Sequence, residues 1–245
     1  MLKLLIPLFC FALIASCADG SKTSGLELGN FIKPTYTQKE SFYKCNLIAG
    51  QTLNSVEKFI PKFIENFALL GDSSEELFFL FPILQSKLKT SSFELLLRHN
   101  NSDSLDKLDL TLSALSFDEI ATCINPLTSN NSSKITNQSI SNSPVVTEIL
   151  ECNYLDGFNY ATMKLVLEQF TDAMIKNKFN VDLTYSDNPL DGSNFQWTNI
   201  FQSLDSRIEF VESWQALEVS KEIQRLLLEQ SACKSSRLYS RYKVL

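Results

Sequence analysis

Few side chains in this chain could do chemistry, and they lie in two places. The only histidine, His99, follows an apolar run and precedes two asparagines. Tyr154, Asp156 and Trp197 lie in the second half, where aromatic rings and a carboxylate could shape a small-molecule pocket. A histidine at the end of a strand is, however, usually a surface residue. Trp197 and its aromatic neighbours could equally form an ordinary core.

Motif searches exclude several kinds of chemistry. A single histidine rules out metal sites that need several imidazole ligands. The sequence has no H-E-x-x-H, G-x-S-x-G, Walker A, G-x-G-x-x-G or C-x-x-C pattern. Asp103, Asp106 and Asp109 recur at three-residue steps, which favours a solvated acidic helix face over a metal site. We therefore expect no metal, no cofactor and no catalytic residue.

The first residues predict export. Lys3 is followed by an apolar run at 4–14 and by small residues before Cys17, a pattern typical of a signal peptide spanning 1–16. The Ile-Ala-Ser-Cys sequence that ends at Cys17 resembles the lipobox of bacterial lipoproteins. That resemblance implies acylation of Cys17 and attachment to a membrane through the lipid. Ordinary signal cleavage after Ala18, which would release a secreted protein, remains the alternative.

Several features define the expected location and partners. Residues 17–39 are predicted to be a flexible tether, since most of 18–30 are small and polar. Ala18 follows the lipid site, where an aspartate would resemble an inner-membrane retention signal, so the resemblance implies an outer-membrane lipoprotein facing the periplasm. The net charge of −6 argues against nucleic-acid binding. The expected partners are the membrane and an unknown small molecule or envelope protein.

Four further cysteines are predicted to form disulfides. Cys45, Cys123, Cys152 and Cys233 are an even number in an oxidising compartment. Their spacings are too wide for the tight cysteine pairs of a zinc site. Four cysteines allow three pairings, so the count alone does not fix the connectivity.

The same cysteines mark an internal repeat. Cys45 and Cys152 each open a C-N-x-x-x-G sequence, and each is followed by apolar residues at helical spacing, at 53–67 and 160–174. Two strand-like runs, a second amphipathic stretch, a cysteine and a short final run follow in both halves. These segments are 77–84, 93–98 and 105–115 in the first half, and 179–185, 195–201 and 205–217 in the second. The second half has extra residues, and 219–231 are predicted to form an additional helix.

The resulting order, strand-helix-strand-strand-helix-strand twice, resembles two fused ferredoxin-like units. Such a pair is similar to the dimeric α/β-barrel architecture, and the fold class is predicted to be α+β. The first repeat covers 40–124 and the second 145–245. Residues 125–144 are predicted to be a Ser/Asn-rich linker without its own order. The basic C-terminal run 233–245 is expected to be a final strand with a solvated basic face.

The resemblance also implies a disulfide pairing and a set of functions. The first and last strands of a ferredoxin-like unit are antiparallel neighbours, which favours Cys45–Cys123 and Cys152–Cys233. The chain is similar to exported proteins of marine bacteria, a resemblance that implies no particular activity. We therefore expect a lipid-anchored, non-catalytic binding module. One alternative is an α/β-barrel enzyme, monooxygenase-like, with haem or no cofactor and with His99 or Asp156 as functional group. The other is a structural envelope protein that assembles through sheet edges.

Overall fold

The structure is a computed structural model that describes residues 38–67, 75–83, 91–126, 129–134, 144–188, 191–234 and 236–244. The predicted signal peptide, the lipid site Cys17 and all of the tether before residue 38 lie outside these residues. Residues 38 and 39, predicted as the end of the tether, already belong to the first strand.

The first half contains the predicted helices and strands in the predicted order. They are β1 (Gln38–Leu47), α1 (Leu53–Phe67), β2 (Glu76–Pro82), β3 (Ser92–His99), α2 (Asp103–Ala114), a 3-10 turn at Phe117–Glu119, β4 (Ala121–Ile124) and β5 (Ser129–Lys134). Helix α1 forms because its apolar residues recur at three- and four-residue steps, which places Val56, Phe59, Phe63 and Phe67 on one buried face.

The second half repeats this order with one helix added. Its elements are β6 (Val145–Tyr154), α3 (Tyr160–Lys176), β7 (Val181–Asn188), β8 (Asp191–Phe201), α4 (Leu204–Ala216), α5 (Glu218–Gln230), β9 (Ser231–Cys233) and β10 (Arg237–Lys243). Helix α3 begins where the Asn159 side chain accepts a hydrogen bond from the backbone amide of Ala161 at 2.8 Å. Helix α5 confirms the additional helix expected at 219–231.

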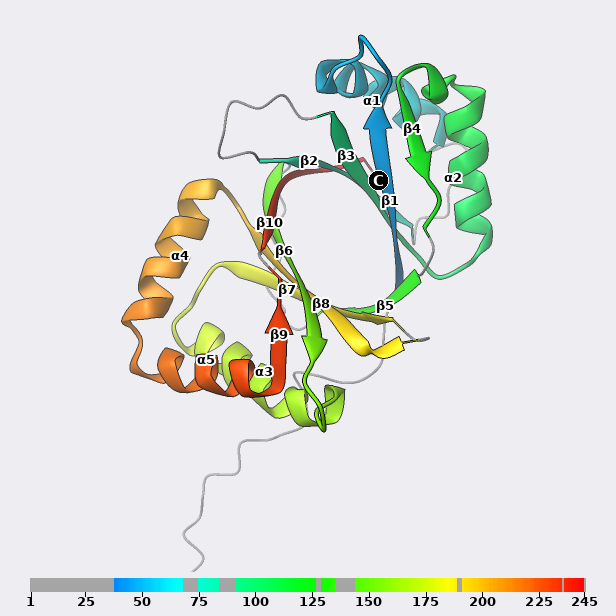
Figure 1. The fold of residues 1–245 in the computed structure, drawn as a ribbon. Helices are drawn as coiled ribbons and strands as arrows, with labels where there is room; N and C mark the ends of the chain where they lie inside the picture. Colours follow the sequence, from blue (N-terminus) through cyan, green and yellow to red (C-terminus); the bar gives the residue numbers. More distant parts are fainter. Residues whose placement is uncertain are drawn as a thin grey trace, which may run out of the picture. The chain divides into compact units, whose positions relative to one another are not determined.

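Eight strands close into an antiparallel barrel in the order β10-β2-β3-β1-β5-β7-β8-β6, and β6 returns to pair with β10. Strands β4 and β9 lie off this ring, paired with β1 and β6. Figure 1 looks along the barrel, with α1 and α2 on one outer side and α3, α4 and α5 on the opposite side. The α+β class is therefore confirmed.

Strands β5 and β10 join the two halves of the ring. Strand β5 pairs with β1 and β7, while β10 pairs with β6 and β2. The prediction that 125–144 has no order of its own is wrong for Ser129–Lys134. That prediction considered only side-chain burial, whereas a strand between two others is held by backbone hydrogen bonds on both edges, which its composition does not reveal.

The two predicted disulfides are confirmed. Cys45 lies opposite Cys123 in the β1–β4 ladder, with a Cα–Cα distance of 4.0 Å. Cys152 lies opposite Cys233 in the β6–β9 ladder, with a Cα–Cα distance of 3.9 Å. The first disulfide therefore links β1 to β4, the short strand that precedes β5. The second links β6 to β9, the short strand that precedes β10.

Each strand has a helix face and a barrel face. On the helix faces, one apolar core packs beneath α1 and α2 and another beneath α3, α4 and α5. The barrel faces enclose a small apolar cluster, which consists of Phe78, Leu80, Leu96, Ile149 and Tyr239 with Phe42 at its edge. Below we call this cluster the apolar plug. The remaining residues on the barrel face are largely polar.

The basic final segment is a strand, as predicted, but its basic face is only partly solvated, since Lys243 is exposed while Arg241 is buried. Arg237 and Tyr239 lie on the same barrel-facing side as Arg241. Arg241 is buried and Arg237 half-buried. The sequence suggested a solvated face because it does not show that β10 closes a barrel.

Candidate functional site

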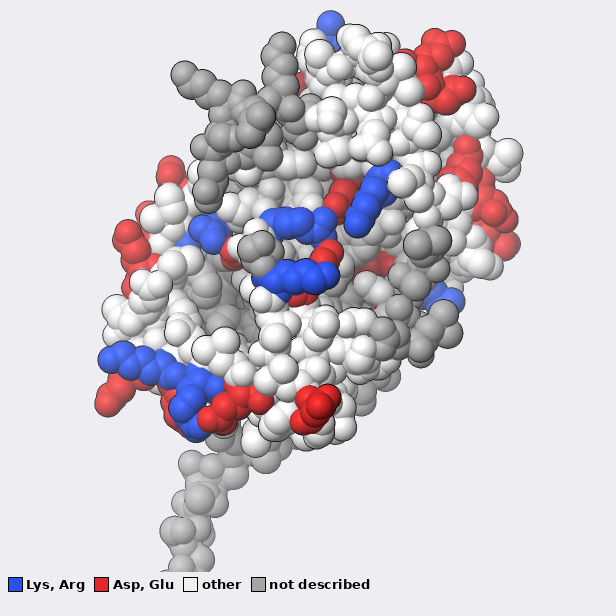
Figure 2. Space-filling view, viewed as in Figure 1, with Lys and Arg blue, Asp and Glu red and all other residues white. Residues whose placement is uncertain are grey.

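The larger of two hollows relevant to function lies at one mouth of the barrel and has a volume of about 860 Å³. This size suits a small-molecule ligand. Its walls come from β1, β2, β3, β4 and β10, and its chemistry-bearing residues are Lys44, Glu94, Arg237 and Tyr239. Pro82, Ile83, Phe93 and Leu238 supply apolar surface. We call this hollow the mouth pocket. In Figure 2, Lys and Arg side chains lie close to carboxylates near the centre of the viewed face, over the barrel.

Glu94 is the central group of the mouth pocket. Its Oε1 accepts a hydrogen bond from Nη1 of Arg237 at 2.7 Å and another from the Tyr239 hydroxyl at 3.0 Å. Its Oε2 accepts none from the residues that the structure describes. The carboxylate is therefore held in place through one oxygen, while the other remains available to a ligand.

Charge and burial determine the protonation of Tyr239 and Arg237, the two residues that donate hydrogen bonds to Glu94. Burial and the neighbouring Glu94 carboxylate raise the pKa of Tyr239, so its hydroxyl stays protonated and remains a donor at neutral pH. Burial alone would lower the pKa of Arg237, but the charges of Glu94 and Glu151 outweigh it and raise that pKa. Arg237 also donates to Glu151, at 2.5 Å. Lys44 is exposed and adds a second cation to the pocket.

The second hollow, of about 280 Å³, lies between the helix face of β6 and β8 and the helices α3, α4 and α5. Its aromatic walls are Phe170, Phe195, Trp197, Phe210 and Trp214. We call it the aromatic pocket. Nε1 of Trp197 donates to Oδ1 of Asn199 at 2.6 Å, and Arg207 pairs with Glu148 beside that amide at 2.6 Å. The Trp197 ring faces the helices and belongs to the apolar core beneath them, as the ordinary-core alternative expected, and it also borders this hollow.

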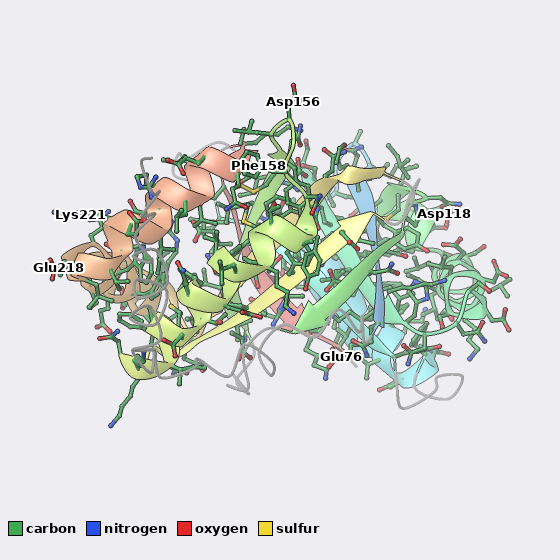
Figure 3. The ribbon with its side chains drawn as sticks, turned by 90° about the horizontal axis from the view of Figure 1, so that it is seen from below. Glu76, Asp118, Asp156, Phe158, Glu218 and Lys221 are labelled. Atoms are coloured by element: carbon green, nitrogen blue, oxygen red, sulfur yellow. A yellow bond between two sulfur atoms is a disulfide. The ribbon has the colours of Figure 1, made fainter. Side chains whose placement is uncertain are left out.

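The structure does not bring the four predicted pocket residues together. Tyr154 bonds through its hydroxyl to Tyr185 and stacks on Phe195, with 4.6 Å between ring centroids, next to the aromatic pocket. Asp156 is exposed in the turn after β6, and Figure 3 shows it at an outer tip, far from Glu76 at the other end of the barrel. Of these four residues, only Trp197 lines the mouth pocket or the aromatic pocket.

His99 is buried, with 1% of its surface exposed, so the prediction of a surface histidine is wrong. Its Nδ1 donates to the carbonyl oxygen of Asn101 at 2.7 Å, which leaves Nε2 to accept from the Ser41 hydroxyl at 3.0 Å. Both ring nitrogens are therefore used, and His99 lines neither hollow. It does not fit the role of an axial haem ligand.

The buried His99 predicts a specific pH dependence of stability. Burial, assisted by the charge of Lys39, lowers its pKa below the usual value near 6.5. As the pH falls below about 6.5, His99 becomes protonated in the unfolded chain but stays neutral in the folded protein. The free energy of unfolding therefore decreases. We expect wild-type protein to lose more unfolding free energy than His99→Gln between pH 7.5 and 5.0, by up to about 1.4 kcal/mol per pH unit. Urea titrations at both pH values measure this, and parallel losses would contradict it.

The described residues show neither a cluster of metal ligands nor a membrane-spanning helix. Within the described ranges, no group of three or more His, Cys, Asp or Glu side chains is placed to hold a metal ion. Asp109, on the predicted acidic face of α2, is half-buried, and burial with the charge of Asp106 raises its pKa. No helix in the described part of the chain combines the length and apolar character needed to cross a membrane.

The fold resembles solved structures of two kinds of enzyme. A candidate monooxygenase from Lactobacillus acidophilus superposes with a TM-score of 0.53 at 10% identity, over 84% of this chain and 95% of the other. A mutant chlorite dismutase from Candidatus Nitrospira defluvii gives a TM-score of 0.56 at 10% identity, over 84% and 92%. A candidate monooxygenase from Fusobacterium nucleatum gives 0.52 at 9% identity, over 85% and 93%. At these identities the likeness shows the fold, a ferredoxin-like dimeric α/β barrel. No protein-family model and no curated sequence matches the chain.

These neighbours contradict the expectation of a non-catalytic binding module and favour the alternative of an enzyme, because the three matched structures are of candidate monooxygenases and a chlorite dismutase. Sequence analysis missed Glu94, Arg237 and Tyr239. A signal was present in 237–241, where Arg237, Tyr239 and Arg241 occupy every second position, and more weakly in 94–98, where Glu94 and Arg98 share one face with Leu96. Reading it required knowing that this face of each strand lines a barrel.

Proposed function

We propose that this protein is a cofactor-free α/β-barrel oxygenase that uses the mouth pocket as its active site. The observation that carries the proposal is the geometry of Glu94, whose Oε1 is fixed by Arg237 and Tyr239 while Oε2 remains available to a ligand. A positioned carboxylate beside apolar walls suits a general base. The fold shared with candidate monooxygenases supports the same class of reaction.

The proposed reaction inserts one oxygen atom into an activated methylene. Glu94 takes a proton from a CH₂ group that lies next to a carbonyl or an aromatic ring, leaving a carbanion in resonance with its enolate. The carbanion passes an electron to O₂, and the two radicals combine to form a C–O bond. Glu94 returns its proton to the outer oxygen, which gives a hydroperoxide. The second C–H proton then leaves while the O–O bond breaks, and it combines with the departing hydroxide as water, so CH₂ and O₂ become C=O and H₂O.

The other residues of the pocket serve the anion that this reaction forms. Arg237 and Lys44 place positive charge near the developing enolate oxygen, which lowers the energy of the charged transition state. The Tyr239 hydroxyl keeps Glu94 oriented through its hydrogen bond. Pro82, Ile83 and Phe93 offer apolar surface to a hydrocarbon or ring system. The predicted substrate is therefore a small, uncharged, ring-bearing ketone with an activated CH₂ group.

Oxygen uptake tests this proposal. Anthrone, an aromatic ketone with one acidic CH₂, is the probe, and the protein is purified in the presence of a metal chelator without added cofactor. We expect saturable oxygen consumption above the spontaneous rate, with one O₂ consumed per anthraquinone formed. A rate that equals the spontaneous oxidation at every protein concentration would contradict the proposal.

We also propose that the barrel arose from two copies of one unit, 40–124 and 145–245. Three observations support this: the shared element order, the bridging positions of β5 and β10, and one disulfide at the matching place in each half. If the halves are equivalent, the two bridges should contribute similar amounts of stability, which the variants described in the Discussion measure.

The site of action is proposed to be the bacterial cell envelope, with attachment through a lipid on Cys17. The lipobox-like sequence and two disulfides in the folded part support an exported protein. Growth with a clickable palmitate analogue tests this. Label is expected on the wild-type protein and not on Cys17→Ala, and equal labelling of both would contradict the assignment.

A further inference from the structure

The other end of the barrel contains a buried arginine that lacks hydrogen-bond acceptors among the described residues. Arg241, on β10, is 8% exposed. Its Nε and Nη1 have no hydrogen-bond acceptor among the described residues. Its neighbour Arg98 is fully engaged, since Nε donates to Glu40 at 2.7 Å, Nη1 to Glu76 at 3.4 Å and Nη2 to Thr184 at 3.4 Å. Every guanidinium nitrogen of Arg98 therefore has a hydrogen-bond acceptor, whereas two of those of Arg241 have none among the described residues.

The nearby carboxylates are already in use. Glu40 accepts from Arg98 and from Ser186, and Glu76 accepts from Arg98 and from Lys243 at 2.6 Å. Asp182 also takes part in an interaction. Arg241 lies over the face of the Phe78 ring, and the Arg241 guanidinium carbon is 4.6 Å from the ring centroid. A ring face stabilises a cation only in part, so the N–H groups still need an acceptor.

Arg241 retains its charge despite its burial. Burial and the charge of Arg98 lower its pKa to about 9, which leaves it protonated at neutral pH. A buried, unpaired cation is strongly destabilising, and native proteins pair such groups. Thr147, on the same inner face of the barrel, also has a buried hydroxyl without a partner in the described part of the chain.

This arginine is separate from the mouth pocket. The apolar plug, which includes Leu80, Leu96 and Ile149, fills the barrel between the two ends. The Arg241 end is bordered by Glu76 and Lys243, whose side chains are 29% and 49% exposed. These partly exposed side chains place the Arg241 end next to solvent, on the side of the apolar plug away from the mouth pocket.

From the unsatisfied guanidinium nitrogens of Arg241 inside the barrel, we propose a second ligand site that binds a small oxyanion, either an inorganic oxyanion or a compact carboxylate. The chemistry follows from the donors, because guanidinium N–H groups match the oxygen atoms of planar anions. Water could accept the hydrogen bonds but would bring no negative charge to Arg241, whose nearby carboxylates Glu40 and Glu76 are bonded to other cations. This site is independent of the proposed oxygenase activity.

Thermal unfolding with sodium nitrate tests the inorganic form and sodium formate the carboxylate form, each against sodium gluconate at equal ionic strength, since gluconate is too bulky to enter. We expect at least one small anion to raise the Tm of wild-type protein by about 5 °C or more at a hundredfold excess over its Kd. Arg241→Met should abolish the rise and should be no less stable than wild type in gluconate, because it removes an unpaired buried charge. Arg225→Met, at an exposed arginine of α5, is the matched control and should keep the rise.

Two outcomes would overturn the site. Equal rises in wild type and Arg241→Met would show a general salt effect, and no rise in wild type with either anion would show that only water meets Arg241. Should Arg241→Met fail to fold, the Arg Nε–H resonances of wild-type protein replace it. One protected Nε–H signal is expected to shift saturably with nitrate or formate, and invariant spectra would overturn the proposal.

Discussion

Glu94→Gln is expected to lower kcat/KM for anthrone oxidation by about 10²- to 10⁴-fold, the range typical of removing a general base. Glutamine keeps the size of the side chain, and its Oε1 can still accept from Arg237 and Tyr239. The fold should therefore persist while the proton acceptor is lost. We expect the loss mainly in kcat, because the apolar walls that hold the substrate are unchanged. Steady-state oxygen uptake measures both constants.

Glu151→Gln is the matched control for this variant. Glu151 is the other carboxylate that pairs with Arg237, but it does not line the mouth pocket. Its replacement should change kcat/KM by less than about tenfold, since no proton acceptor is removed. Equal losses in the two variants would show that charge balance around Arg237 matters and that Glu94 is not the base.

Removing the second disulfide is expected to lower the free energy of unfolding by about 4 kcal/mol. Cys152 and Cys233 are separated by 81 residues, and in the entropic model a bridge of this length restricts the unfolded chain by that amount. The double variant Cys152→Ala/Cys233→Ala is compared with wild type by urea unfolding, monitored by tryptophan fluorescence. Trp197 and Trp214 both pack in the core beside this bridge, so they report on it directly.

The other bridge provides the comparison. Cys45 and Cys123 are separated by 78 residues, so Cys45→Ala/Cys123→Ala should lower stability by a similar amount. A loss confined to one pair, with the other pair neutral, would contradict the equivalence of the two halves. Losses below about 1 kcal/mol in both would show that the barrel needs neither bridge.

Local patterns predicted the helices and most strands. Helix α1 is readable because Val56, Phe59 and Phe63 recur at helical spacing and are buried as that spacing requires. The cysteine pairing followed from the resemblance to a ferredoxin-like unit, and the structure places the cysteines in register in the β1–β4 and β6–β9 ladders. Strand β5 is not readable in this way, since its polar residues are held by neighbours that are remote in sequence.

The candidate site was harder to predict than the fold, because it depends on which face of each strand points inward. Trp197 and Glu94 both lie on strands, yet the first faces helices and the second faces the barrel mouth. Alternation separates the two faces of a strand but does not say which face is inside a closed barrel. His99 was misplaced for a related reason. Its partner Ser41 lies 58 residues away, and only the β1–β3 ladder brings the two together.

A crystal structure of the protein with the product anthraquinone tests the central claim most directly. The account predicts electron density for the ring system in the mouth pocket, with a carbonyl oxygen near Arg237 or Lys44 and the reacting carbon within reach of Glu94 Oε2. Density against Trp197 and Phe170 in the aromatic pocket, with the mouth pocket empty, would contradict it.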